Sequence, residues 1–189
     1  MSLQTTSSQT VGPYLHIGLA WLVTDDLAPT GVSGERITLQ GRITDGDGQP
    51  VNDALVEIWQ ANAKGRYAHP EDARDILLEP AFKGFGRVPT DDDGAFRFAT
   101  IKPGRVPAPA GGLQAPHINV IILMRGMLKQ LTTRIYFAGD PANDEDPVLQ
   151  AVDPERRQTL LATATPEKPG VLRWDVRLQG DRETVFFEY

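Results

Sequence analysis

Cysteine is absent from the 189 residues, and its absence removes several classes of function at once. A chain without thiols forms no disulfide, has no cysteine nucleophile and holds no zinc–thiolate or iron–sulfur centre. Serine is nearly as scarce, because Ser2, Ser7, Ser8 and Ser33 are the whole supply and none lies in a Gly-x-Ser-x-Gly context. The sequence therefore argues against a serine hydrolase.

Excess positive charge and long hydrophobic runs are also missing. Lys and Arg number 19 against 25 Asp and Glu, so the net charge of −6 gives no general attraction for nucleic acid or anionic membrane. No wholly apolar run is longer than Val120–Met124, which is far too short to span a bilayer. The first ten residues lack both a basic start and an apolar stretch, so we expect no signal peptide. We expect an intracellular, cytoplasmic protein.

Short alternating segments separated by turn residues dominate the rest of the chain. Ile37–Ile43 alternates apolar and polar side chains, and Ala54–Trp59 resumes as a strand after the turn residues Asp45–Pro50. These two strands are expected to form a hairpin. The other strand candidates are Ala95–Thr100, His117–Met124, Thr132–Phe137, Val171–Leu178 and Thr184–Phe187.

Helix signals are few. Asp153 followed by Pro154 is a good helix start, which predicts a short helix over Pro154–Thr163, and residues 70–83 are expected to hold a turn or two of helix within a long loop. The pattern predicts an all-β fold, a β-sandwich of mostly antiparallel strands with one short helix and long loops. We expect residues 1–12 to form an N-terminal arm and residues 13–189 a single domain.

The segment Leu39–Tyr67 resembles the signature of the intradiol ring-cleaving dioxygenases, and further matches extend the resemblance over nearly the whole chain. In the segment the matching positions are Gly41, Ile43, Gly48, Val51, Val56, Glu57, Ile58, Gly65 and Tyr67. The other matches are Gln9–Tyr14, Gly84–Arg87, Thr90–Asp91, Ile101–Gly104, Pro116–Asn119, Arg134–Phe137 and Val185–Phe187.

The resemblance implies a β-sandwich enzyme that uses Fe(III) and O2 to cleave a catechol between its two hydroxyls. The chain is similar to the α-type subunits of heteromeric members, in which a homologous β subunit holds the iron through two Tyr and two His. The implied substrates are 3,4-dihydroxybenzoate (protocatechuate) and O2, and the product is 3-carboxy-cis,cis-muconate, an intermediate of the β-ketoadipate pathway. The implied partners are that iron-bearing β subunit and a larger αβ oligomer.

This chain lacks two of the four iron donors that the family pattern requires. Fe(III) is a hard cation that favours anionic oxygen donors and can ionise a phenol. Tyr67 and His117 match one donor of each kind, but Val106 stands where the pattern has the second Tyr and Asn119 where it has the second His. Gln114 also replaces the Arg that precedes the histidine pair. The resemblance therefore implies no catalytic residue and no metal site on this chain alone.

Tyr67 and His117 are open to two interpretations. One is a vestigial metal pair. The other, which we favour, is that hydrogen bonds satisfy the phenol and the imidazole, either to each other or to Asn119, because a neutral phenol needs the metal to become a useful ligand. His16 and His69 are expected to be ordinary hydrogen-bonded or loop residues.

In the family, the α-type subunit forms a wall of the partner's active site. The matching substrate-binding positions are Thr10, Gly12, Pro13, Tyr14 and Arg125. Gly12-Pro13 would bring rigid, side-chain-poor backbone near a flat ligand, and Tyr14 would offer ring contact and a hydroxyl. Arg125 would attract the substrate carboxylate. The alternatives are that Pro13-Tyr14 only anchors the arm and that Arg125 is a solvated strand end.

Spacing separates Arg125 from the His117 region. If the chain from His117 to Arg125 stays extended, the two residues lie roughly 26 Å apart at ~3.3 Å per residue. They could not then serve one small ligand in one chain, which is consistent with donation of Arg125 across a subunit boundary. Two rival functions remain open: a homomeric dioxygenase with divergent ligands, and a non-enzymatic β-sandwich binding module.

Overall fold

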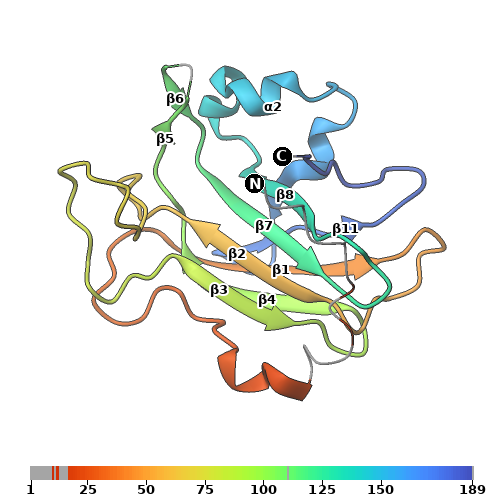
Figure 1. Ribbon diagram of the computed structural model, residues 1–189. Coiled ribbons are helices and arrows are strands. Elements are labelled where there is room, and N and C mark those ends of the chain that lie inside the picture. The colour runs from red at the N-terminus through yellow and green to blue at the C-terminus, as the bar shows by residue number, and fades with distance from the viewer. Residues whose placement is uncertain (1–9, 11, 13–16, 110, 189) are drawn as a thin grey trace, which may run out of the picture.

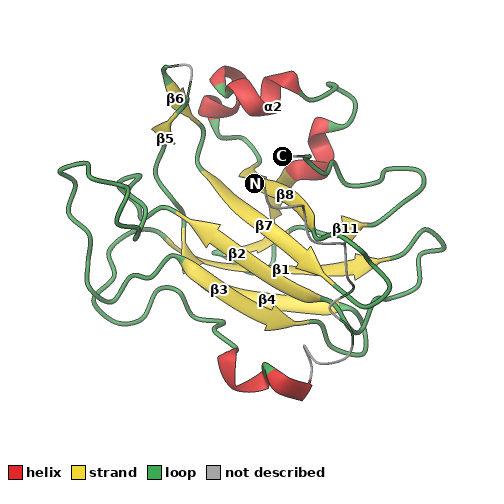
Figure 2. Cartoon of the chain, in the orientation of Figure 1, coloured by secondary structure: helices red, strands yellow, loops and turns green. Residues whose placement is uncertain are grey.

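Two sheets packed face to face make up the regular structure of the computed structural model, which describes residues 10, 12, 17–109 and 111–188 (Figures 1 and 2). One sheet has the order β3-β2-β7-β8-β9, and the other has the order β4-β1-β10, with β11 continuing along β1. A separate β5–β6 pair stands beside them. The strands are β1 (Arg36–Thr44), β2 (Leu55–Gln60), β3 (Phe85–Pro89), β4 (Ala95–Ile101), β5 (Val106–Pro107), β6 (Leu113–Gln114), β7 (His117–Leu123), β8 (Leu131–Phe137), β9 (Leu161–Ala164), β10 (Val171–Arg173) and β11 (Val176–Arg177).

The main core lies between the two sheets and follows from the alternation of side chains along each strand. On β7, Ile118, Val120 and Ile122 are fully buried and face the other sheet, while the residues between them face outward. β2 runs antiparallel to β7 over its whole length, with Leu55 opposite Leu123 and Gln60 opposite Ile118. This unbroken pairing keeps His117–Leu123 extended, and the β-sandwich prediction is confirmed.

Strand β9 joins the two sheets. Its first half, Leu161 and Ala162, pairs in parallel with the end of β8, and its second half, Thr163 and Ala164, pairs antiparallel with β10. Because one strand takes part in both sheets, the strand order runs continuously from β3 to β11.

Short helices lie at the edges of the sandwich (Figure 2), and the three that follow β8 contribute to a second, smaller core. The short helices are the 3₁₀ helices η1 (Ala20–Leu22), η2 (Pro141–Glu145) and η3 (Arg157–Leu160) and the α-helix α2 (Pro147–Ala151). The helix predicted over Pro154–Thr163 is wrong: its residues form a turn, η3 and the start of β9. The Asp-Pro pair that starts an α-helix is Asp146-Pro147, where the carboxylate caps Val148 N and Leu149 N. Residues 70–83 contain no helix.

Three predictions about the strands also need correction. β1 and β2 do not form a hairpin, because β1 pairs with β4 while β2 pairs with β3 and β7, so the turn after β1 crosses from one sheet to the other. The segment Val171–Leu178 is divided into β10 and β11 at Trp174-Asp175, and Thr184–Phe187 is not a strand. The other strand predictions are confirmed to within two residues at each end. The division into an arm and a domain after residue 12 stays a prediction.

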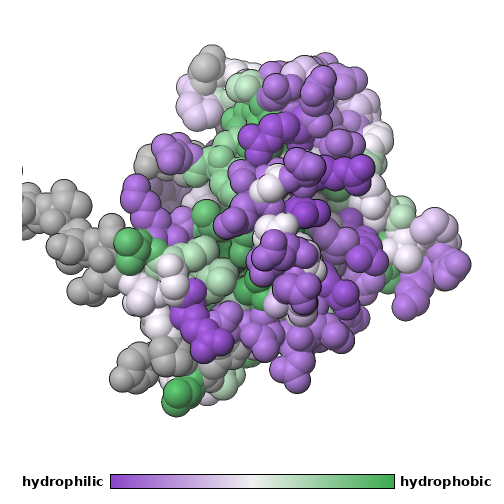
Figure 3. All heavy atoms as spheres, turned by 90° about the vertical axis from the view of Figure 1, so that its right-hand side faces the viewer, coloured by the Kyte–Doolittle hydropathy of each residue, from purple (hydrophilic) through white to green (hydrophobic). Residues whose placement is uncertain are grey.

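The outer surface is mainly hydrophilic on the face shown in Figure 3, with a narrow band of hydrophobic residues between the polar ones. No helix within the described ranges is both long enough and apolar enough to cross a bilayer.

Candidate functional site

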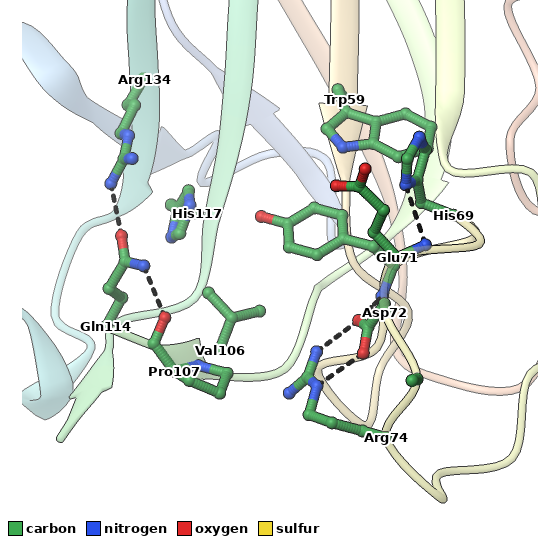
Figure 4. A pocket seen from close by; sticks show the side chains of 12 residues that line it. Trp59, His69, Glu71, Asp72, Arg74, Val106, Pro107, Gln114, His117 and Arg134 are labelled. Atoms are coloured by element: carbon green, nitrogen blue, oxygen red, sulfur yellow. Dashed lines mark hydrogen bonds and ion pairs between the residues drawn. The ribbon is translucent and has the colours of Figure 1, made fainter. Parts of the chain in front are cut away.

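A cavity of about 810 Å³ opens where β7, the β5–β6 pair and the loop after β2 meet (Figure 4). Tyr67, Val106 and His117, three of the four positions at which the family pattern has iron ligands, line it. The fourth, Asn119, lies beside Tyr67, since its Nδ2 is 3.4 Å from Tyr67 Oη. The fold therefore brings all four positions together, as the sequence motifs imply.

Tyr67 is placed by a tight loop that follows β2. Asn62, which is buried, accepts hydrogen bonds at Oδ1 from Lys64 N at 3.0 Å and Arg66 N at 2.9 Å. Gly65 has a φ of +80°, and a Cβ there would lie 1.9 Å from Arg105 O, so only glycine fits. The sequence analysis passed over Asn62, although a turn-forming Asn two residues after a strand is a signal for such a loop.

The Tyr67 ring is stacked on Trp59, with centroids 5.7 Å apart and an interplanar angle of 11°. Burial raises the pKa of the Tyr67 phenol above its usual value, while the hydrogen bond from Asn119 and the charge of Arg134 oppose that rise. The phenol is therefore neutral at physiological pH.

His117 is almost fully buried, with 3% of its surface exposed, and its Nδ1 lies 2.8 Å from the backbone oxygen of Ala115. A carbonyl oxygen only accepts, so Nδ1 carries the proton in the neutral ring. Burial and the nearby Arg134 guanidinium lower the pKa of His117 to about 4. Tyr67 and His117 are thus each hydrogen-bonded, to Asn119 and Ala115 respectively and not to each other.

The lowered pKa of His117 predicts a loss of stability in mild acid. The unfolded histidine takes up a proton near pH 6.5, but the folded one does so only near pH 4. The unfolded state therefore binds more protons between these values, and the free energy of unfolding falls as the pH drops through that window, by up to about 3 kcal/mol. Urea unfolding at pH 7 and pH 5 measures this loss, and a His117→Phe variant should lack this part of it. An equal loss in that variant would contradict the assignment.

The residues present do not fit a ferric ion. Val106 has no donor atom, and the Asn119 amide nitrogen lies 3.4 Å from both Trp59 O and Tyr67 Oη. Neither replaces an anionic oxygen or an imidazole. Among the described residues, no group of three or more His, Asp or Glu side chains could hold a metal ion.

Arg134 and Gln114 form a polar wall of the cavity that the sequence analysis did not recognise as a unit. Arg134 Nη1 donates to Gln114 Oε1 at 2.7 Å, and Gln114 Nε2 donates to Pro107 O at 2.9 Å (Figure 4). Arg134 stands opposite Asn119 in the β7–β8 ladder, so its side chain shares the outward face with Asn119. One sequence signal could have pointed to Arg134: it lies in the matched segment Arg134–Phe137.

Two of the positions predicted to bind substrate, Thr10 and Arg125, lie at the other end of β7. Arg125 follows that strand, is 65% exposed and forms an ion pair with Asp53. Thr10 accepts a hydrogen bond at Oγ1 from Gly126 N at 3.0 Å, which places Thr10 beside the turn that carries Arg125. Pro13 and Tyr14 lie outside the described residues, as does His16.

Known proteins resemble the chain both in sequence and in fold. A family model described as "Dioxygenase" matches residues 22–180. The chain is 44% identical to the protocatechuate 3,4-dioxygenase alpha chain of Burkholderia cepacia, covering 99% of this chain and 98% of that one. It is 42% identical to the beta chain from the same organism, over 68% of this chain and 56% of that one. The solved dioxygenase domain of a carbohydrate-binding fusion protein from Streptomyces sp. SirexAA-E matches with a TM-score of 0.62 and 25% identity, covering 86% of this chain and 89% of that one.

Proposed function

Because this chain belongs to the intradiol ring-cleaving dioxygenase family, we propose that it is the α subunit of a heteromeric protocatechuate 3,4-dioxygenase. The family is iron-dependent, and in our proposal a homologous β subunit holds the iron. One observation carries the proposal: the chain matches an alpha chain from end to end, yet Val106 and Asn119 stand where two iron donors are required.

In the proposed reaction, O2 cleaves 3,4-dihydroxybenzoate between its hydroxyls to give 3-carboxy-cis,cis-muconate. We assign the iron chemistry to the partner and no step of it to this chain. This chain contributes the surface that Thr10 and Arg125 share, together with Gly12, Pro13 and Tyr14 from the matched motif. The position of Arg125 supports the proposal that its side chain reaches the partner's active site. His117 begins β7, whereas Arg125 follows the last residue of that strand.

Arg125 is expected to bind or steer the substrate carboxylate. An Arg125→Ala change removes the charge, so KM for protocatechuate should rise about tenfold, the usual effect of losing a hydrogen bond to a charged group. KM for catechol, which has no carboxylate, should change much less. Steady-state kinetics of the αβ complex with both substrates measure the difference.

A matched Arg125→Lys variant keeps the charge but loses the planar fork, and it should fall between wild type and Arg125→Ala. Because Arg125 also pairs with Asp53, a purely structural role is the competing explanation. Equal losses for protocatechuate and catechol would show that the role is structural.

Expression of the chain alone and with a β-type subunit tests the proposed function. We expect iron binding and protocatechuate-dependent O2 uptake only after co-expression. Iron and a tyrosinate-to-iron colour in the chain alone would instead support a homomeric enzyme. Absence of ring cleavage even with a bound β-type subunit would support a non-enzymatic binding module.

A further inference from the structure

Asp53 and Arg125 extend the β2–β7 ladder beyond its last paired residues. Leu55, at the start of β2, stands opposite Leu123, at the end of β7 (Figure 1). Two residues further out along the two chains are Asp53 and Arg125, which strand alternation places on the same face as that pair. Their ion pair therefore joins the turn before β2 to the turn after β7.

The backbone on either side of Asp53 is firmly held. Val51 and Ala54 are buried in the main core. Val51 N donates to Ile43 O at 3.0 Å, and Ala54 N donates to Thr90 Oγ1 at 3.1 Å. A carboxylate on such a rigid base can fix the direction of the group that it binds.

Arg125 is the more exposed member of the pair. Its side chain is 65% exposed, against 17% for the side chain of Asp53. Asp53 Oδ2 is shielded from solvent and accepts no hydrogen bond from the part of the chain that the structure describes, so the charge of Arg125 compensates it. A ligand that arrives from solvent therefore meets the guanidinium before the carboxylate.

The contact leaves one end of the guanidinium available. The ion pair joins Arg125 Nε to Asp53 Oδ2, whereas Nη1 and Nη2 donate no hydrogen bond to residues 10, 12, 17–109 or 111–188. A guanidinium has five donors in one plane, and its two terminal nitrogens form a fork that matches a carboxylate. Asp53 therefore engages Nε and leaves the terminal fork to a ligand.

We propose that Asp53 is a positioning residue for the substrate carboxylate, because it holds Arg125 by Nε with the terminal nitrogens directed to the substrate. The inference rests on the proposed function, in which Arg125 reaches the partner's active site. Asp53 acts through Arg125 and does not touch the substrate itself. An arginine that is ordered beforehand loses less conformational entropy when it binds, so the pairing strengthens binding.

The negative charge of Asp53 acts in the opposite direction, because it partly offsets the positive charge of Arg125. The substrate carboxylate approaches the terminal nitrogens, so it lies nearer to the guanidinium than to Asp53, which is on the Nε side. We therefore expect the ordering of Arg125 to dominate, and loss of the Asp53 charge to weaken binding.

Steady-state kinetics of the αβ complex with protocatechuate and catechol test the proposal. Asp53→Asn keeps the shape of the side chain but removes its charge, so KM for protocatechuate should rise about fivefold. The kcat and the KM for catechol should change by less than about twofold. Asp53→Glu keeps the charge on a longer side chain and should give an intermediate KM for protocatechuate. A fall in that KM, or equal changes for the two substrates, would overturn the proposal.

Glu57→Gln is the matched control. Glu57 also lies on β2, its side chain is 16% exposed, and it accepts a hydrogen bond from Arg87 Nε at 2.6 Å. This variant should leave both KM values unchanged. If Asp53→Asn does not fold, Asp53→Glu carries the test, and an unchanged KM for protocatechuate in it would refute the proposal.

A double variant shows whether Asp53 acts through Arg125. In the Arg125→Ala background, Asp53→Asn should have no further effect on KM for protocatechuate. A further rise would mean that Asp53 has a separate structural role, which contradicts the proposal.

Failure of the proposed function has a different signature. If the wild-type αβ complex does not turn over protocatechuate, or if Arg125→Ala affects both substrates equally, the role assigned to Arg125 is wrong and the inference falls with it. If Arg125→Ala raises KM for protocatechuate alone while Asp53→Asn leaves it unchanged, only the inference is refuted.

Discussion

A double variant of this chain, Val106→Tyr with Asn119→His, is expected to acquire a ferric site of its own. The two substitutions restore the donors that the family pattern requires, and both positions lie beside the donors already present. Val106 lines the same cavity as Tyr67 and His117, and Asn119 Nδ2 is 3.4 Å from Tyr67 Oη. The open cavity provides room for the larger phenol.

The expected result is one additional iron per αβ pair, with a visible tyrosinate-to-iron absorption band from the altered chain. A bound ferric ion lowers the pKa of a phenol far enough to offset the effect of burial on Tyr67. Iron analysis and absorption spectra of the purified protein measure the gain.

Three controls separate a built site from adventitious iron. Each single variant offers only three donors and should bind iron much more weakly than the double variant. Adding Tyr67→Phe to the double variant should remove much of the band. Iron uptake that is independent of Tyr67 would show that the four positions do not converge as the structure has them.

The largest loss of stability is expected from Asp146→Ala. Asp146 is completely buried, and its carboxylate accepts four hydrogen bonds that tie the end of β8, the segment before β7 and α2 together. The donors are Ala115 N at 2.7 Å, Leu149 N at 2.8 Å, Val148 N at 2.9 Å and Tyr136 Oη at 3.1 Å. Removing the carboxylate leaves these donors buried and unsatisfied, so unfolding should become easier by about 3–5 kcal/mol.

Asp153→Ala is the matched control, because Asp153 also precedes a proline but is exposed and accepts one side-chain hydrogen bond, from Glu155 N at 3.1 Å. Its free energy of unfolding should change by less than about 1 kcal/mol. Denaturant unfolding of the three proteins measures both effects. Similar losses in the two variants would mean that burial of Asp146 does not matter as described.

Alternation within a strand is a local property, and this explains why strands such as β1, β4, β7 and β8 could be predicted from the sequence. Which strand pairs with which is not local. The turn after β1 has good hairpin chemistry, yet it leads to β2 in the opposite sheet, because each strand buries its apolar face by packing against the other sheet.

The helix error has a similar cause. Asp140-Pro141, Asp146-Pro147 and Asp153-Pro154 carry the same start signal within fourteen residues of one another. Only contacts distant in sequence, such as Ala115 N and Tyr136 Oη on Asp146, decide which of them caps the α-helix.

The candidate site also has a part that the sequence predicts and a part that it does not. The motifs identified Tyr67, Val106, His117 and Asn119 as one group. The family pattern has ligands of one iron at these four positions, so the resemblance already implies that they lie close together. Gln114 was noted only as a substitution in that pattern. Its contact with Arg134, twenty residues further along, depends on the register between β7 and β8, which sequence alone does not reveal.

The double pairing of β9 has a consequence for how the molecule comes apart. A sandwich whose halves share no strand can loosen one layer while the other persists, but here Leu161–Ala164 is hydrogen-bonded into both layers. Fraying of β9 therefore removes neighbours from β8 and β10 together, and amide hydrogens on these two strands should exchange with deuterium at matching rates. This four-residue strand joins the two layers, so we expect them to unfold together in one cooperative transition.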